Sequence, residues 1–124
     1  SAGKQYAAQL LISEYTVAKL KGTYRMRDID DVIIKGKTKP VCVFEVLDFH
    51  SDESFPNLME VVNYFNDGRK HYKAGDWDKA IASFGESFAL HPEDRLSDIY
   101  ITRCKEMKKN PPKDWDGVLK LESK

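Results

Sequence analysis

Two β-branched stretches separated by a short basic turn constrain the fold of this chain more than any other feature. The first ends in Val32-Ile33-Ile34, and the second is Val41-Cys42-Val43-Phe44-Glu45-Val46. Between them lies Lys35-Gly36-Lys37-Thr38-Lys39-Pro40. β-branched and aromatic residues favour extended backbone, and a glycine at a strand end lets the chain turn sharply. The sequence therefore predicts two strands joined by a hairpin.

A shorter apolar stretch precedes these strands. Residues 9–12 predict a first strand, and Ser13 can cap a helix over residues 14–21, because its hydroxyl can accept from the N–H groups of the first turn. Gly22 supplies the left-handed residue that ends such a helix. The first half is thus predicted to be a strand, a helix and two further strands.

The second of these strands has an irregular apolar pattern. Ile29, Val32 and Ile34 cannot all face the same side of a regular strand, in which successive side chains alternate between faces. One extra residue in the strand would restore the alternation. We therefore predict a β-bulge near Asp30-Asp31.

The second half of the chain is predicted to be helical. Residues 48–57 are polar and rich in turn formers, which is typical of a linker. A helix over residues 94–109 is indicated by apolar residues at helical spacing, namely Leu96, Ile99, Tyr100, Cys104 and Met107. Residues 115–118 are expected to fold the tail back onto the helices.

The segment between the linker and this helix resembles one tetratricopeptide repeat, a helix-turn-helix unit of about 34 residues. Asp67 and Ser87 depart from the pattern of that repeat. The resemblance implies that two antiparallel helices approach closely at Gly68 and Ala80, and that a third helix covers them, since a lone repeat cannot bury its face. The matching positions are Tyr64, Gly68, Tyr72, Gly75-Asp76-Trp77, Ala80, Phe84, Leu90 and Pro92.

The first half resembles the carboxyl-terminal end of a class III nucleotide cyclase catalytic domain. The resemblance rests on Leu10-Leu11-Ile12-Ser13-Glu14-Tyr15-Thr16, Lys35-Gly36-Lys37 and Pro40-Val41, which occur in the order typical of that family. In similar cyclases the strand ends in V-K-G-K, and the first lysine reaches the triphosphate of the substrate. The resemblance therefore implies triphosphate binding by Lys35, with Ile34 in place of valine, and no catalytic role for Lys37.

The same resemblance implies which parts of a cyclase this chain lacks. The aspartates that bind Mg²⁺ or Mn²⁺, and the Asn-x-x-x-Arg helix that steadies the transition state, are expected upstream of Ser1. Catalytic residues and a bound metal are therefore not expected in this fragment. Asp28, Asp30 and Asp31 do not have the family's metal-site spacing, and we interpret them as solvated or salt-bridged.

Composition excludes several other classes of protein. Lys plus Arg and Asp plus Glu number 20 each, so no overall field favours nucleic acid. Cys42 and Cys104 have no Cys or His partner at zinc-site spacing and are interpreted as reduced, buried thiols of a cytosolic protein. His71 and His91 are interpreted as non-ligands. The chain has no apolar run of the roughly 18 to 20 residues that a bilayer requires, and cytoplasmic localisation is expected.

These observations predict an α+β protein in two parts. Residues 1–47 form a partial cyclase-type βαββ segment, residues 48–57 a linker, and residues 58–124 an all-α tetratricopeptide-like hairpin with a capping helix and tail. The preferred hypothesis is the carboxyl-terminal fragment of a bacterial-type adenylate or guanylate cyclase, preferably one that converts ATP to cyclic AMP, with the fragment itself inactive.

The alternative hypothesis is a non-catalytic adaptor or scaffold whose helical module binds peptides. The substrate of the parent enzyme would be a nucleoside triphosphate, and the helical module could bind a protein or peptide. A homodimer is expected because an incomplete sheet exposes strand edges that a second copy can pair with.

Overall fold

The computed structural model describes residues 11–13, 25–34, 36–48 and 50–121. Over these residues the chain is an α+β protein, as predicted. The chain divides into two compact units. One is Ser1–His50 together with Val118–Lys124, and the other is Ser51–Gly117. The elements, in chain order, are β1 (Leu11–Ser13), β2 (Met26–Ile34), β3 (Val41–Val46), α3 (Leu58–Lys73), α4 (Trp77–Leu90), α5 (Arg95–Lys109) and β4 (Leu119–Leu121).

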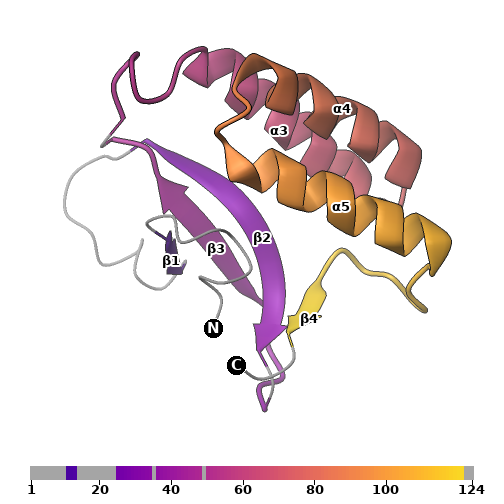
Figure 1. Cartoon of the computed structure of the whole chain (residues 1–124). Coiled ribbons are helices and arrows are strands. Elements are labelled where there is room, and N and C mark those ends of the chain that lie inside the picture. Colours follow the sequence, from indigo (N-terminus) through magenta and orange to yellow (C-terminus); the bar gives the residue numbers. More distant parts are fainter. Residues whose placement is uncertain (1–10, 14–24, 35, 49, 122–124) are drawn as a thin grey trace. The chain divides into compact units, whose positions relative to one another are not determined.

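The described strands of the first unit form one mixed sheet with the order β1-β3-β2-β4 (Figure 1). β3 runs antiparallel to both β1 and β2, whereas β4 runs parallel to β2. The hairpin predicted between β2 and β3 is confirmed. Gly36 has a positive φ of 88°, and the N–H of Lys37 donates to the carbonyl of Ile34 at 2.9 Å.

β4 differs from the sequence prediction, which assigned residues 118–124 to the helical module. In the structure Leu119, Lys120 and Leu121 pair with Val32, Ile33 and Ile34 of β2, and the segment from Val118 onward belongs to the unit that contains the sheet. Three residues are too few to show a strand period, and the partner strand lies more than eighty positions earlier in the chain. Local sequence patterns therefore could not reveal this strand.

A bulge in β2 is present, slightly earlier than predicted. The register between β2 and β3 shifts between Asp28 and Asp30, so that Ile29 is the extra residue. Ile29 and Val32 are both buried as a result, as expected if the bulge lets them face the same side. Ile34 is 45% exposed and does not join them.

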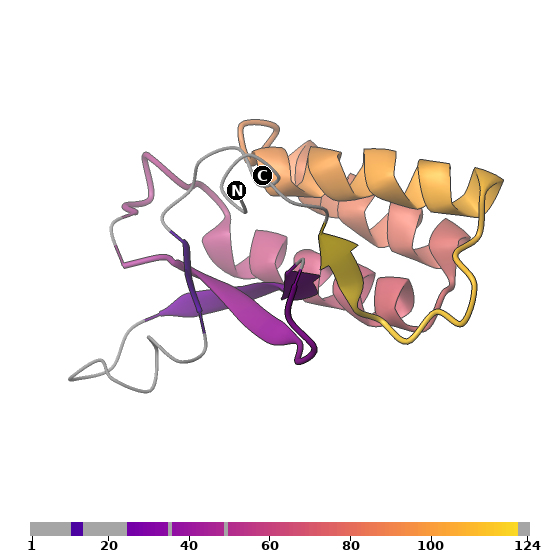
Figure 2. The same ribbon diagram turned by 90° about the horizontal axis from the view of Figure 1, so that it is seen from below.

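The second unit contains the three helices of the described chain, which lie side by side with short connections in both views (Figures 1 and 2). α3 packs against α4, and α4 packs against α5. The close approach predicted at Gly68 is confirmed, because a Cβ there would lie 2.7 Å from the ring of Phe84. The fully buried side chains of this core are Val61, Phe65, Tyr72, Ala80, Phe84, Leu96, Tyr100 and Cys104.

The ends of the helices follow from local chemistry. Asn57, which precedes α3, has a positive φ of 59°, a conformation that asparagine tolerates better than most residues. Gly75 follows α3 with a φ of 78° and allows the turn into α4. The side chain of Asp76 then accepts from the N–H of Lys79 at the start of α4.

The tail folds back onto the helices, as predicted. The indole N–H of Trp115 donates to the carbonyl of Tyr72 at 2.9 Å. The Trp115 ring also packs against Tyr72 and Trp77, with centroid distances of 5.2 and 5.7 Å. A Cβ at Gly117 would lie 3.3 Å from side-chain atoms of Lys73, which is a tight contact, and the φ of 88° favours glycine.

Candidate functional site

The candidate site among the described residues lies on two paired strands, β2 and β3. Opposite residues of antiparallel strands project from the same face of a sheet. Asp28 lies opposite Phe44, and Asp31 lies opposite Cys42. Phe44 and Cys42 are two residues apart on β3 and so share a face. The bulge therefore places Asp28, Asp31 and Cys42 together on that face.

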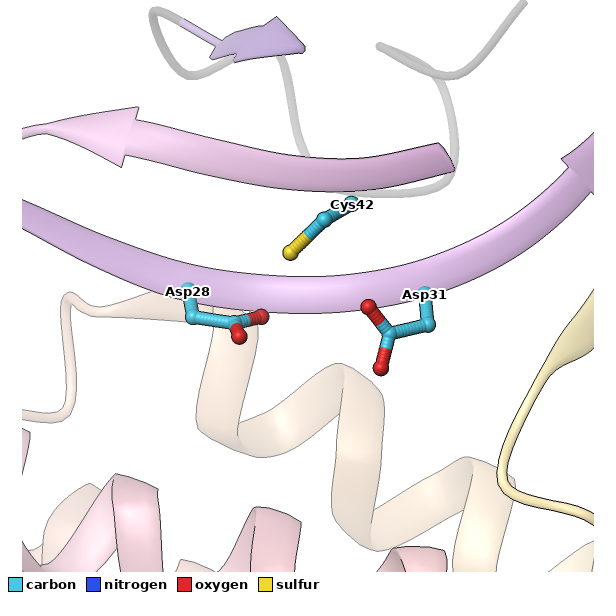
Figure 3. Close-up of side chains that lie close together, drawn as sticks. All are labelled: Asp28, Asp31 and Cys42. Carbon is cyan, nitrogen blue, oxygen red and sulfur yellow. The ribbon is translucent and has the colours of Figure 1, made fainter. Parts of the chain in front are cut away.

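Figure 3 shows these three side chains converging, with both carboxylates on the same side of β2 and the thiol of Cys42 directed between them. One ligand atom from each residue lies within 4.8 Å of the others. All three residues are half-buried. We refer to Asp28, Asp31 and Cys42 as the bulge cluster.

The electrostatics of the bulge cluster favour a protonated thiol. Burial is the largest cause that raises the pKa of Cys42, and the negative charge of Asp28 is the next. Hydrogen bonding to Asp31 and the charge of Asp31 add to the shift. Cys42 is in no disulfide bond, as predicted, although it is half-buried rather than buried.

The opposite face of the same strands carries a buried ion pair. Arg27 lies opposite Glu45, and both residues are almost completely buried. The Nε of Arg27 donates to Oε1 of Glu45 at 3.1 Å, and Nη2 of Arg27 contacts the same oxygen. Because this pair lies on the other face, the sheet separates it from the bulge cluster.

Asp30 lies on the same face of the sheet as the buried ion pair. It lies opposite Val43 and is fully buried. Its carboxylate oxygen Oδ1 accepts from the backbone N–H of Asp31, the next residue along β2, at 2.9 Å. This hydrogen bond fixes the backbone that presents Asp31.

The basic hairpin predicted to bind triphosphate is only partly described. Lys35, the predicted triphosphate ligand, lies outside the described residues, as does the predicted helix over residues 14–21. Gly36, Lys37 and Lys39 are described, and all three are exposed at the end of the hairpin. The role assigned to Lys35 stays a prediction.

The bulge cluster is not evident from the sequence. The sequence indicates that Asp28 and Asp31 are solvated or salt-bridged, and that Cys42 is a reduced, buried thiol with no Cys or His partner at zinc-site spacing. Residues three apart on a regular strand face opposite sides, so their spacing argues against a shared site. The useful signal was the irregular apolar pattern of β2, which already required a bulge.

The interpretation of the two histidines of the helical unit, His71 and His91, as non-ligands stays a prediction. The ring of His91 packs against Phe55 with a centroid distance of 4.7 Å. Among the described residues, the ligand cluster that can surround one ion is the bulge cluster, and it contains neither His71 nor His91.

Most of this chain is similar to part of a known protein. Adenylate cyclase, terminal-differentiation specific, of Dictyostelium discoideum is 29% identical over 105 residues, which is 82% of this chain and 5% of that protein. The chain thus spans a small part of the relative's length. No protein-family model and no solved structure matches the chain. The similarity supports a relationship to cyclases.

Within the part of the chain that the structure describes, we find no helix with the length and apolar character needed to cross a membrane.

Proposed function

We propose that this chain is part of a longer adenylate cyclase, of which residues 1–47 form the carboxyl-terminal end of the catalytic domain. The observation that carries the proposal is the similarity to an adenylate cyclase of Dictyostelium discoideum over 82% of the chain. The basic hairpin between β2 and β3 supports it, because the structure contains the strand-turn-strand in which the cyclase-like Lys35-Gly36-Lys37 motif lies.

The proposed reaction converts ATP to cyclic AMP and pyrophosphate. The ribose 3′ hydroxyl attacks the α-phosphorus, a new P–O bond forms, and the bond to the pyrophosphate oxygen breaks. Lys35 would hold the triphosphate and offset the charge that develops on the leaving pyrophosphate. The catalytic aspartates and arginine of the family have no counterpart in this chain, so the chain alone is proposed to be inactive.

The bulge cluster does not fit the Mg²⁺ or Mn²⁺ ions proposed for the whole enzyme. These hard cations prefer ligand sets made of oxygen atoms, whereas the bulge cluster includes the sulfur of Cys42. The ions of the cyclase reaction are therefore proposed to bind residues outside this chain.

The helical unit is proposed to be a tetratricopeptide-like module that binds a protein or peptide. Support comes from the tight contact of Gly68 with Phe84 and from the complete burial of Ala80 and Tyr72, positions at which the repeat pattern demands small and aromatic residues. An adaptor without catalysis is the alternative function, and it rests on this unit alone. Pairing of two copies through strand edges is proposed as the route to a homodimer.

Lysine substitutions in the complete enzyme test the site proposal. Lys35→Ala should lower kcat/KM for ATP by roughly 30- to 1000-fold, corresponding to a loss of about 2 to 4 kcal/mol in transition-state stabilisation. Lys37→Ala is the matched control, because it removes a lysine of the same hairpin, and should have a much smaller effect. Steady-state kinetics with both variants measures the difference. Equal losses would refute the assignment of Lys35.

A further inference from the structure

We propose that the bulge cluster, Asp28, Asp31 and Cys42, binds one divalent transition-metal ion of the Zn²⁺ type. The inference does not depend on the proposed cyclase function, because it rests on the geometry of β2 and β3 alone.

The register of the sheet carries the first step of the argument. On a regular β2, Asp28 and Asp31 would project from opposite faces. The extra residue Ile29 reverses the alternation, so both carboxylates flank Cys42 on one face (Figure 3). Bulges commonly redirect side chains in this way next to functional sites.

Two features hold the bulge in place. The extra residue, Ile29, is fully buried, and this burial resists straightening of the strand. The hydrogen bond from the N–H of Asp31 to the buried carboxylate of Asp30 restrains the same backbone. Ligands held by a rigid backbone lose less conformational entropy when an ion binds.

The distances suit one small ion. The three ligand atoms lie within 4.8 Å of one another. Zn²⁺ bonds to carboxylate oxygen and thiolate sulfur are about 2.0 to 2.3 Å long, so two ligands of one tetrahedral ion are separated by about 3.3 to 3.7 Å. Small side-chain rotations would close the remaining gap. The half-buried position leaves room for a fourth ligand, such as water.

The donor types select the class of metal. One sulfur and two carboxylates suit Zn²⁺ and Co²⁺ better than Mg²⁺ or Ca²⁺, which favour oxygen ligands. On binding, the thiol would release its proton to solvent, and the thiolate and two carboxylates would together outweigh the charge of the ion. The neighbouring negative charges that disfavour a free thiolate would thus be offset by the metal.

Cobalt spectroscopy on the reduced, full chain tests the proposal. Co²⁺ bound to a thiolate gives a charge-transfer absorption in the near ultraviolet, which a site without sulfur lacks. We expect this band at a stoichiometry of one ion, and its displacement by Zn²⁺ but not by excess Mg²⁺. Cys42→Ser should abolish the band, whereas Cys104→Ala should retain it.

Substitution of each aspartate tests whether its carboxylate binds the metal, and an aspartate outside the cluster is the control. Asp28→Asn and Asp31→Asn should each weaken Co²⁺ binding by about tenfold or more, while Asp52→Asn, an exposed aspartate of the linker, should have no effect. Circular dichroism shows which variants fold, and either folded aspartate variant suffices for the comparison. Absence of the band in the wild-type chain, its persistence in Cys42→Ser, or unchanged affinity in the folded aspartate variants would overturn the proposal.

Discussion

At the scale of single residues, β2 and β3 place charged groups on both faces of one sheet. The ion pair between Arg27 and Glu45 is almost completely buried, whereas the bulge cluster is half-buried. A buried pair contributes little net stability compared with apolar residues of similar size, but breaking it leaves one charge uncompensated. The two faces should therefore respond very differently to charge removal.

Removal of one charge from the buried pair should destabilise the sheet. We expect Glu45→Gln to lower the free energy of unfolding by about 3 to 5 kcal/mol, because the buried Arg27 loses the negative charge of Glu45. The double variant Arg27→Met with Glu45→Leu should recover most of that loss. Chemical denaturation followed by far-ultraviolet circular dichroism measures both. An unchanged midpoint in Glu45→Gln would contradict the buried charge pair.

The two thiols should react slowly in the folded protein. Burial raises the pKa of Cys104 to about 12, although the charge of Arg103 opposes the shift, and burial together with Asp28 raises the pKa of Cys42. Only the thiolate is nucleophilic, so a disulfide reagent at neutral pH should modify the native chain far more slowly than the unfolded chain.

The pH dependence of this reactivity follows from the same shifts. Unfolded cysteine ionises near pH 8.5, so its modification rate should level off above that pH, while the native rate keeps rising. Because folding holds the protons on both thiols, their contribution to stability is complete below about pH 8.5 and is lost as pH rises toward the raised native pKa values. A stopped-flow series from pH 7 to 10 measures the rates. Equal native and unfolded rates would show that the thiols are not shielded.

At the scale of elements, the helical unit depends on one close contact between α3 and α4. A Cβ at Gly68 would lie 2.7 Å from two ring carbons of Phe84, a distance that requires the ring or a helix to move. Phe84 is itself fully buried and stacks on Tyr100 with a centroid distance of 4.7 Å. The ring therefore has little freedom to yield.

Alanine at two glycine positions tests this contact. Gly68→Ala should destabilise the helical unit by about 1 to 3 kcal/mol through overpacking. Gly85→Ala is the matched control in α4, because a Cβ there meets nothing within 4 Å, and it should stabilise the helix by up to about 1 kcal/mol. Both tryptophans, Trp77 and Trp115, lie in this unit, so thermal melts followed by tryptophan fluorescence report on it. A neutral Gly68→Ala would contradict the close packing.

Elements with a strong local pattern could be predicted from the sequence. The helix predicted over residues 94–109 from its apolar spacing agrees closely with α5, and the hairpin agrees with its β-branched strands and Gly36. β4 could not be predicted, because a parallel strand of three residues depends on a distant partner. The bulge was predicted near Asp30-Asp31, but its position at Ile29 depends on cross-strand pairing that the local pattern does not contain.

The candidate site could likewise be predicted only in part from the local sequence. The resemblance to cyclases indicated Lys35, whose position in the structure lies outside the described residues. The bulge cluster could not be found by residue spacing, since Asp28 and Asp31 come together only after the register shift. A site built by an irregularity in one strand becomes visible only when both strands are paired.

At the scale of the whole molecule, the chain consists of two compact units with different proposed roles. The sheet unit includes both ends of the sequence, since Val118–Lys124 groups with Ser1–His50. The helical unit is therefore inserted between two parts of the sheet unit. This arrangement differs from the predicted succession of a cyclase part, a linker and a helical part.

Cyclic AMP formation from ATP is the measurement that tests the cyclase proposal most directly. A longer protein that contains this chain and the sequence upstream of Ser1 should produce cyclic AMP with Mg²⁺ or Mn²⁺, while the isolated chain should not exceed a control without protein. Turnover by the isolated chain would show that the upstream residues are not needed. A folded longer protein that binds peptides but forms no cyclic AMP would contradict the cyclase proposal and favour an adaptor.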